Sequence, residues 1–70
     1  MYEFKQRFIV QDLESGEFLC PDPTGGITQT PYIKQAGKFD YQEDAMDAGI
    51  DEIGEQFAIF SFFERSEVKS

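Results

Sequence analysis

Apolar and polar residues alternate along 2–11 (YEFKQRFIVQ), which is the pattern of a strand with one buried face. Ile9 is the apolar exception on the polar side. The turn formers of 12–17 (DLESGE) follow, and 17–20 (EFLC) supplies a second short strand. Strand, glycine-containing turn and strand together predict a β-hairpin. Four residues of the first strand are expected to face the core: Tyr2, Phe4, Phe8 and Val10.

The middle of the chain has less regular patterning. Residues 21–26 (PDPTGG) predict a loop, because prolines cannot donate to a strand ladder and paired glycines leave the backbone free. Residues 27–38 favour extended structure, but Pro31 restricts such structure to an edge or to short pieces. We therefore expect one short strand around 32–39.

Residues 41–53 predict a single amphipathic helix. Asp40 is expected to be its N-cap, with Glu43 three residues later in a variant of the capping box. Gly49 is expected to let the helix lie close to the sheet, and Gly54 is placed to end it. The face expected to pack on the sheet consists of Ala45, Met46, Gly49, Ile50 and Ile53.

Residues 56–63 (QFAIFSFF) predict the most hydrophobic strand of the chain. Its two faces consist of Phe57, Ile59 and Phe63 on one side and Ala58, Phe60 and Phe62 on the other. Because both faces are apolar, the strand is expected to be central in the sheet and to pair with the first strand. The fold class is α+β: a small antiparallel sheet of three to four strands with one helix on one face, in the order ββ(β)αβ. One domain is expected over 1–64, with a flexible C-terminal tail at 65–70.

Composition narrows the function classes. The net charge of the 70-residue chain is −8 with only six Lys and Arg, so direct binding to nucleic acid or to an anionic membrane surface is disfavoured. No apolar segment approaches the roughly 20 residues of a membrane span. Cys20 is the only cysteine, which excludes an internal disulfide and fits a reducing compartment. A cytoplasmic location is expected, in the host cell if a phage encodes the protein.

Enzyme chemistry is not expected. The chain has no histidine, so it has no imidazole base and no Ser-His or Cys-His pair. Residues 24–26 (TGG) are too short for a phosphate loop, and no GK[ST] follows them. A calcium loop starting at Asp44 would need oxygen ligands at 46 and 48, which are Met and Ala. We expect no cofactor and no metal, and Cys20 is expected to be a small core or edge residue.

The predicted helix carries carboxylates without a compensating cation. Glu43, Asp47 and Asp51 recur every fourth residue, and each like-charged pair costs roughly 0.2–0.5 kcal/mol. Such a surface could be an ordinary solvated face or a docking surface for a basic partner. The residues predicted to bind a partner are Glu43, Asp44, Asp47, Asp51, Glu52 and Glu55.

The face of the sheet away from the helix is a second candidate. One helix covers one side, so one apolar face of 56–63 remains, covered in part by the loop 21–38. Ala58, Phe60 and Phe62 are the candidate residues for a dimer or another apolar interface. RNA-binding sheets also expose aromatic rings, but they need basic flanks that this chain lacks.

The hairpin segment 8–19 (FIVQDLESGEFL), the segment 36–49 (AGKFDYQEDAMDAG) and the strand 56–63 together resemble small proteins of phages and prophages. These proteins have a strand, an ESGEFL-like turn, a second strand, a helix opened by A-x-x-F-x-x-x-E-x-A, and a closing strand. The resemblance implies an architecture more than an activity. The matching positions are Ser15, Gly16, Glu17, Phe18, Leu19, Ala36, Phe39, Glu43 and Ala45.

The resemblance, taken together with the acidic charge, implies a non-enzymatic acidic accessory protein of a phage or prophage. Its acidic helix would bind and modulate or inhibit a host protein that handles nucleic acid or acts in defence. A looser likeness to tiny phage inhibitors of host RNA polymerase points the same way. The alternative is a small homodimeric structural protein of a phage or prophage with no host target.

Overall fold

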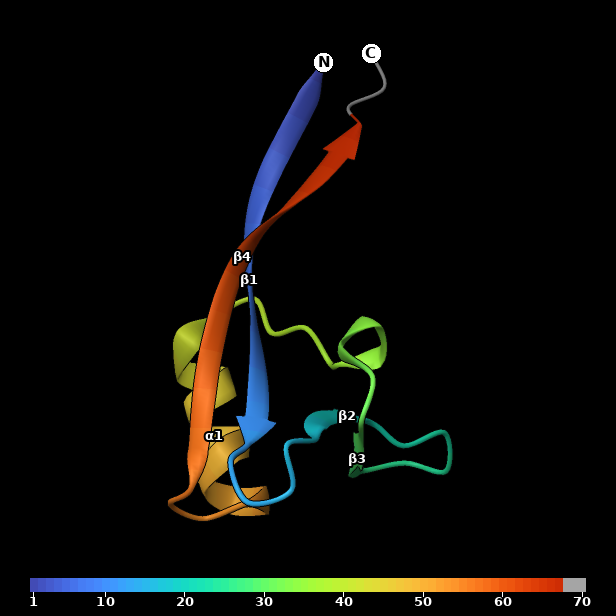
Figure 1. Ribbon diagram of the computed structural model, residues 1–70. Coiled ribbons are helices and arrows are strands. Elements are labelled where there is room, and N and C mark those ends of the chain that lie inside the picture. Colours follow the sequence, from blue (N-terminus) through green and yellow to red (C-terminus); the bar gives the residue numbers. More distant parts are fainter. Residues whose placement is uncertain (68–70) are drawn as a thin grey trace.

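The computed structural model describes residues 1–67 and contains one four-stranded sheet, one α-helix and one short 3-10 helix (Figure 1). In chain order the elements are β1 (Tyr2–Asp12), β2 (Phe18–Pro21), β3 (Ile27–Thr30), η1 (Ile33–Gln35), α1 (Gln42–Glu52) and β4 (Phe57–Glu67). The α+β class predicted from the sequence is confirmed.

The sheet is antiparallel throughout and has the strand order β3-β2-β1-β4. The predicted pairing of the last strand with the first is confirmed. The prediction that the last strand is central is wrong, because β1 is central and β4 is an edge strand. Strand β4 is hydrophobic because each of its two faces packs into a separate small core. A strand at the edge of a sheet can be covered on both faces in this way.

The β1–β4 pair is a long ribbon that projects beyond the rest of the molecule (Figure 1). Its register runs without interruption from Tyr2 opposite Glu67 to Asp12 opposite Phe57. The outer part of this ribbon, residues 2–7 and 62–67, is called the arm below. Nothing packs on the end of the arm, so Tyr2 and Phe4 are 54% and 66% exposed and the prediction that they face the core is wrong.

The arm also changes the predicted tail. Residues 65–67 continue β4 and pair with the first residues of β1. The domain therefore extends past the predicted boundary at 64. The remainder of the predicted tail, 68–70, lies outside the described residues.

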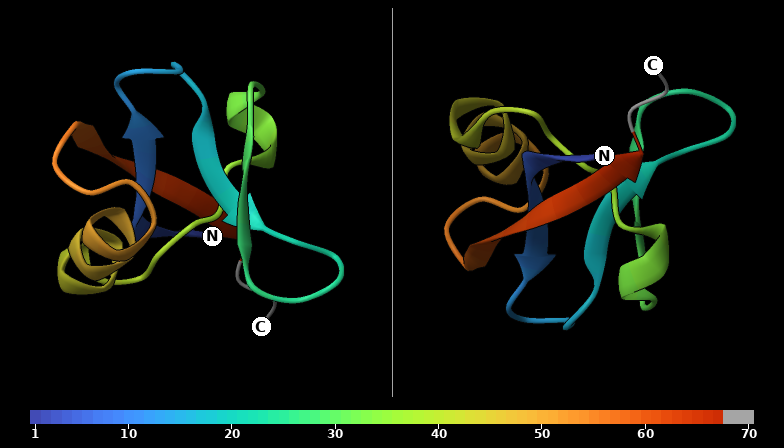
Figure 2. Two further views of the ribbon diagram at one scale, coloured as in Figure 1. Left: turned by 90° about the horizontal axis from the view of Figure 1, so that it is seen from below. Right: turned by 90° about the horizontal axis from the view of Figure 1, so that it is seen from above.

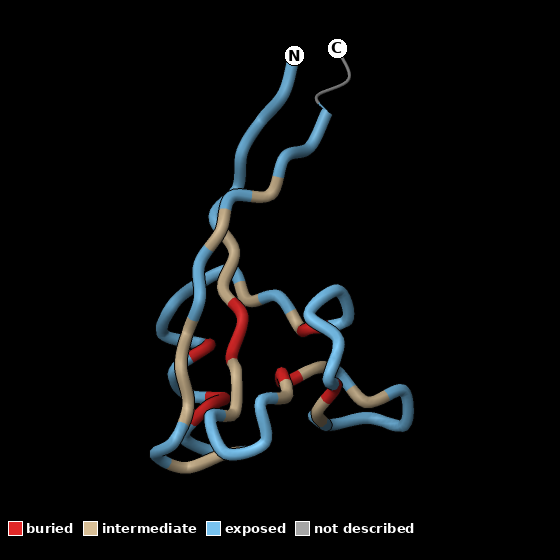
Figure 3. The backbone as a smooth tube through the Cα atoms, in the orientation of Figure 1, coloured by how far each residue is buried: buried red, intermediate tan, exposed pale blue. Residues whose placement is uncertain are grey.

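Two small cores lie on the two faces of the sheet (Figure 3). On the helix side, Val10, Leu19, Ala45 and Ala48 are buried, and Phe57 and Ile59 pack against them. On the other side, Ile9, Phe18 and Ala36 are buried, and Phe62 packs against them. Views along the ribbon show α1 and η1 on opposite sides of it (Figure 2). The expected partial cover of the second face by the loop 21–38 is thus confirmed by Ala36.

The predicted hairpin at the start of the chain is confirmed. Asp12 organises the turn, because its Oδ1 accepts the N–H of Glu14 at 2.9 Å and that of Ser15 at 3.4 Å. Gly16 completes the turn with φ of 77°, a conformation that side-chain-bearing residues rarely adopt. The strand expected around 32–39 is wrong. Strand β3 lies earlier, at 27–30, and Pro31 ends it and is followed by η1.

The start of α1 differs from the prediction. Tyr41 occupies the N-cap position, and no side chain caps the helix. Asp40 is instead an ion-pair partner of Lys5 and Arg7, each at 3.3 Å, so the predicted Asp40–Glu43 capping box is wrong. The predicted end is confirmed: Gly54 has φ of 109° and its N–H bonds to the carbonyl of Gly49 at 3.0 Å.

The buried side of α1 is rotated relative to the prediction. Ala45, Ala48 and Gly49 are buried, whereas Met46 and Ile50 are 40% and 54% exposed. Gly49 sets this rotation because the ring of Phe57 occupies the space of its missing side chain. A Cβ atom at Gly49 would lie 2.5 Å from Cε2 of that ring. The prediction that Gly49 permits close approach to the sheet is confirmed.

Candidate docking surface on the helix

All six carboxylates predicted to bind a partner are exposed: Glu43, Asp44, Asp47, Asp51, Glu52 and Glu55. They do not form one patch. Glu52 lies on the side of α1 toward β2 and β3, where it lines a hollow with Leu19 and Ile27. Glu55 lies beyond the helix, in the turn that leads to β4. The remaining four carboxylates lie along the part of α1 that points away from the sheet.

No described cation neutralises these carboxylates. Every ion pair among residues 1–67 joins Lys5, Arg7 or Lys38 to Asp40 or Glu64. Arg65 lies over the ring of Tyr2, 4.5 Å from its centre. The first turn of α1 contains two acidic residues, which interact favourably with the positive N-terminal end of the helix dipole. The last turn contains no basic residue to complement the negative C-terminal end. The negative charge toward the end of the helix is therefore unfavourable for the helix itself.

Lys5, Arg7 and Lys38 form their ion pairs with Asp40 and Glu64 at the base of the arm. Arg7 is mostly buried, and its Nη1 lies 3.2 Å from Oε1 of Glu64 while its Nη2 donates to the carbonyl of Lys38 at 3.2 Å. Lys38 also donates to Glu64, and this hydrogen bond is the main reason that the pKa of Glu64 is lowered. Nearby Lys and Arg charges act in the same direction. This cluster fastens the segment 38–40 to the ribbon, which explains why Asp40 is not a helix cap.

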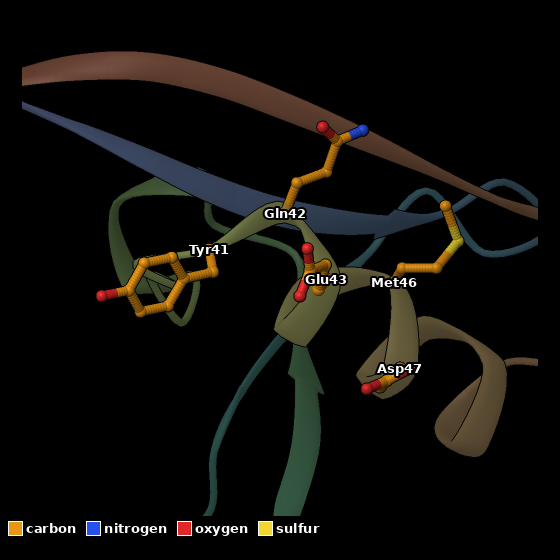
Figure 4. Close-up of a pocket in the computed structure, with 5 residues that line it drawn as sticks. All are labelled: Tyr41, Gln42, Glu43, Met46 and Asp47. Atoms are coloured by element: carbon orange, nitrogen blue, oxygen red, sulfur yellow. The ribbon is translucent and has the colours of Figure 1, made fainter.

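A hollow of about 360 Å³ lies at the first turns of α1 and is lined by Tyr41, Gln42, Glu43, Met46 and Asp47 (Figure 4). In Figure 4 the ring of Tyr41 and the side chain of Met46 extend to opposite sides, and Glu43 lies between them. The hollow thus combines an aromatic ring, a thioether and two carboxylates. This is the chemistry that holds a Lys or Arg side chain, with the ring and thioether along its apolar stem and the carboxylates near its charge.

The second candidate surface, around Ala58, Phe60 and Phe62, lies on the sheet face opposite α1. Phe62 is half-buried because it packs against the small core of this face. Phe60 is 47% exposed and lines an apolar hollow of about 350 Å³ together with Ile9 and Ile33. Ala58 lies beside Phe60 on β4 but does not line that hollow. Phe62 lines the same hollow, so the structure keeps Phe60 and Phe62 together, and only Phe60 of the three offers a substantial exposed ring.

Sequence reasoning missed Tyr41 and placed Met46 on the buried side. Tyr41 precedes the helix and belongs to no apolar stripe, so periodicity gives no signal for it. Met46 follows Ala45 on the helix, and only the contact between Gly49 and Phe57 decides which of the two faces the sheet. That contact joins residues from different elements and could not be read from the helix sequence alone.

Other chemistry is sparse in residues 1–67. No three His, Cys, Asp or Glu side chains lie together as metal ligands there. Cys20 is a free, half-buried thiol on β2. The lowered pKa values of Asp12 and Asp22 arise mainly from hydrogen bonds donated by backbone N–H groups of their own turns, those of Glu14 and Thr24. None of the helical segments in this part of the chain has the length and apolar character needed to cross a membrane.

Comparisons with protein-family models, with curated proteins and with solved structures find no match to this chain.

Proposed function

We propose that this protein is a non-enzymatic binding protein that docks the acidic side of α1 on a basic surface of another protein. The observation that carries the proposal is that all six carboxylates of 43–55 are exposed and no cation of residues 1–67 is paired with them. Following the resemblance of the sequence, the protein is an accessory protein of a phage or prophage. Its target is a host protein that handles nucleic acid or acts in defence.

The hollow at the start of α1 gives this surface a specific contact. An Arg or Lys side chain entering it would meet the ring of Tyr41 and the carboxylates of Glu43 and Asp47. A cation over an aromatic ring at an exposed site contributes about 0.5–1 kcal/mol, and each exposed ion pair about 0.2–1 kcal/mol. Several such contacts are needed for micromolar affinity, because that corresponds to about 8 kcal/mol. The surface therefore selects a partner with several cations.

The arrangement of the carboxylates fits a surface that normally receives nucleic acid. Glu43, Asp47 and Asp51 follow one another at intervals of four residues, which is about 6 Å along a helix. Arg and Lys that bind phosphate also bind carboxylate, often with two parallel hydrogen bonds. Long-range attraction to such a surface mainly raises the association rate and weakens as salt is added.

The test replaces Asp47, Asp51 and Glu55 by Lys and compares the variant with wild type. Affinity capture from a bacterial lysate, followed by mass spectrometry, identifies a partner. Titration of that purified partner then gives the dissociation constant at two salt concentrations. The matched control replaces Glu3, Glu14 and Glu67 by Lys, which changes the net charge equally at exposed positions away from α1.

The helix variant is expected to lose binding by at least about tenfold, or 1.4 kcal/mol, while the control keeps most of its affinity. A second variant, Tyr41→Ser, is expected to weaken binding by a smaller factor because it removes the ring of the hollow. Equal losses in the helix variant and the control would show that only net charge matters. Unchanged binding in a folded helix variant would refute the acidic docking surface.

The alternative function is a homodimeric structural role without a host target. The exposed ring of Phe60 beside an apolar hollow favours it. Because Phe62 is part of the core, Phe60→Ser is the cleaner change for testing that face. A dimer that this variant abolishes, in a protein that captures no partner, would favour the alternative.

A further inference from the structure

The outer edge of β4 has no strand partner among residues 1–67. All eleven residues of β4 pair with β1 on one side only. Long edge strands with free backbone groups are sites of association, and proteins that remain monomeric protect them with prolines, bulges, charges or short length. Strand β3, at the other edge of the sheet, has such protection: it is four residues long and is followed by Pro31. Residues 57–63 of β4 contain no proline, no bulge and no charge.

The hydrogen bonds of β1 identify which groups β4 presents at this edge. The N–H and C=O of Phe8 both bond to Phe39, at 2.9 and 2.8 Å, so they point away from β4. Phe8 lies opposite Ser61, and in an antiparallel pair the two opposed residues share one orientation. The N–H and C=O of Ser61 therefore point to the outer edge. The same alternation places the free groups of Ile59 and Phe63 there.

We propose that two copies of this chain pair antiparallel through the outer edges of their β4 strands, about a twofold axis at Ser61. The two four-stranded sheets then form one continuous sheet. Ser61 would exchange both of its backbone hydrogen bonds with Ser61 of the second copy, and Ile59 would do so with Phe63 of the second copy. This register uses only residues whose backbone groups already point outward.

The register also pairs apolar side chains on both faces. On the helix-free face Phe60, 47% exposed, would lie opposite Phe62 of the second copy. On the helix side Phe63, 67% exposed, would lie opposite Ile59 of the second copy, which packs beneath α1. Cross-strand aromatic and branched pairs of this kind stabilise a sheet by about 0.2–1 kcal/mol each.

The exposed apolar residues of α1 lie on the side where the second copy would arrive. Gly49 contacts Phe57 of β4, whereas Glu52 faces β2 and β3. At 100° per residue, Met46 and Ile50 lie beyond Gly49 on the side away from Glu52, toward the edge of β4. Figure 4 shows Met46 extending in that direction. Phe63 of the second copy would thus fill space beside Met46 and Ile50, which the seating of Gly49 on Phe57 leaves exposed in a single chain.

Charge favours a second copy at this edge over other faces. Two chains of net charge −8 repel each other, but residues 57–63 carry no charge, and the arm carries three acidic and three basic side chains. In the proposed register Glu64 lies opposite Ala58, and Arg65 lies opposite Phe57. An axis at Glu64 would instead oppose two carboxylates.

At roughly 200 Å² per ring, the exposed parts of Phe60 and Phe63 with Met46, Ile50 and the backbone edge reach the order of 1,000 Å² over both copies, the low end of specific interfaces.

The dimer and the proposed basic partner both approach Met46, but they depend on different charged residues. Asp47 and Asp51 lie on the side of α1 away from β4, so they remain exposed when two copies pair. The two associations also respond oppositely to salt. Screening weakens attraction between the acidic helix and a basic partner, whereas it relieves repulsion between two negative chains and strengthens the dimer.

The experiment measures mass by sedimentation over a dilution series, at low and at moderate salt. Wild type is expected to reach twice the chain mass of 8.0 kDa, with tighter association at moderate salt. Ser61→Pro removes an outward N–H and none of the bonds to β1, so it should raise the dissociation constant at least about tenfold. Ser61→Ala is its control. Phe63→Lys should have a similar effect, whereas Phe4→Lys, at an equally exposed ring on β1, should not.

The register is tested by cysteine cross-linking in a Cys20→Ala background. Ser61→Cys is expected to give a reducible dimer under mild oxidation, because the two residues meet at the axis. Ser66→Cys, on the same strand, is expected to give none. A wild type that is monomeric at every concentration would overturn the proposal and leave the edge open to a strand of another protein. A dimer insensitive to both Ser61→Pro and Phe63→Lys would also overturn the proposal, because its interface would then not include the β4 edge.

Discussion

Gly49 allows a direct test of how α1 is seated on the sheet. In an isolated helix, Gly49→Ala would stabilise by about 1 kcal/mol, since Gly is among the poorest helix formers. Here the added Cβ would lie 2.5–2.8 Å from three carbons of the Phe57 ring, well inside van der Waals contact. Overpacking of a core by one methyl group costs typically about 1–3 kcal/mol. The steric effect exceeds the propensity gain, so we expect a net loss of about 1 kcal/mol.

Thermal and urea unfolding followed by circular dichroism, at one fixed protein concentration, measure this loss. For a domain of this size 1 kcal/mol corresponds to a fall in Tm of about 4–8 °C. The companion variant Phe57→Leu removes the ring. In that background Gly49→Ala should be neutral or stabilising, which gives an interaction free energy of about 1–2 kcal/mol in the double-mutant cycle. A single variant Gly49→Ala that is more stable than wild type would refute the reasoning.

Two further predictions concern stability. Leu19→Ala should lower the free energy of unfolding by about 2–5 kcal/mol, because Leu19 is fully buried. Phe4→Ala, on the exposed arm, should change it by less than about 0.5 kcal/mol. Equal losses in chemical denaturation would contradict the exposure of the arm. The pKa of Glu64 is lowered in the folded state by its hydrogen bond from Lys38, so its contribution is fully present above the ordinary carboxyl pKa of 4.5 and is lost as pH falls through the lowered value. Wild type should therefore be more stable than Glu64→Gln at neutral pH, and the difference should shrink below pH 4.5; a difference that grows on acidification would show that the ion cluster does not stabilise the fold.

Much of the architecture follows from local patterns in the sequence. The strand at 2–11, the turn at 12–17 and the helix ending at Gly54 each depend on neighbouring residues, and the structure confirms them. Pro31 correctly indicated an interruption, but periodicity could not show whether the short strand precedes or follows it. The capping role of Asp40 was wrong because Lys5 and Arg7, distant in sequence, bind its carboxylate.

The candidate site was only partly readable from the sequence. The exposure of the six carboxylates follows from their charge and needs no tertiary information. The hollow of Tyr41 and Met46 depends on the rotation of α1, which the ring of Phe57 decides. The edge position of β4 depends on strand order. An apolar strand with two covered faces gives the same pattern at an edge as at the centre, so hydrophobicity alone could not distinguish them.

The β1–β4 ribbon has a consequence for how the chain folds. Its ladder joins Tyr2 to Glu67 and Asp12 to Phe57, so the longest run of backbone pairs in residues 1–67 connects segments that are far apart in the sequence. Strand β1 can pair with β2 after closing only the short turn between them, whereas its long pairing with β4 requires the whole segment 13–56 to close as a loop. Closure of such a long loop is entropically unfavourable and slows folding. Because Tyr2 and Glu67 lie opposite each other at the tip of the arm, a change at either residue would act on this slow step of folding.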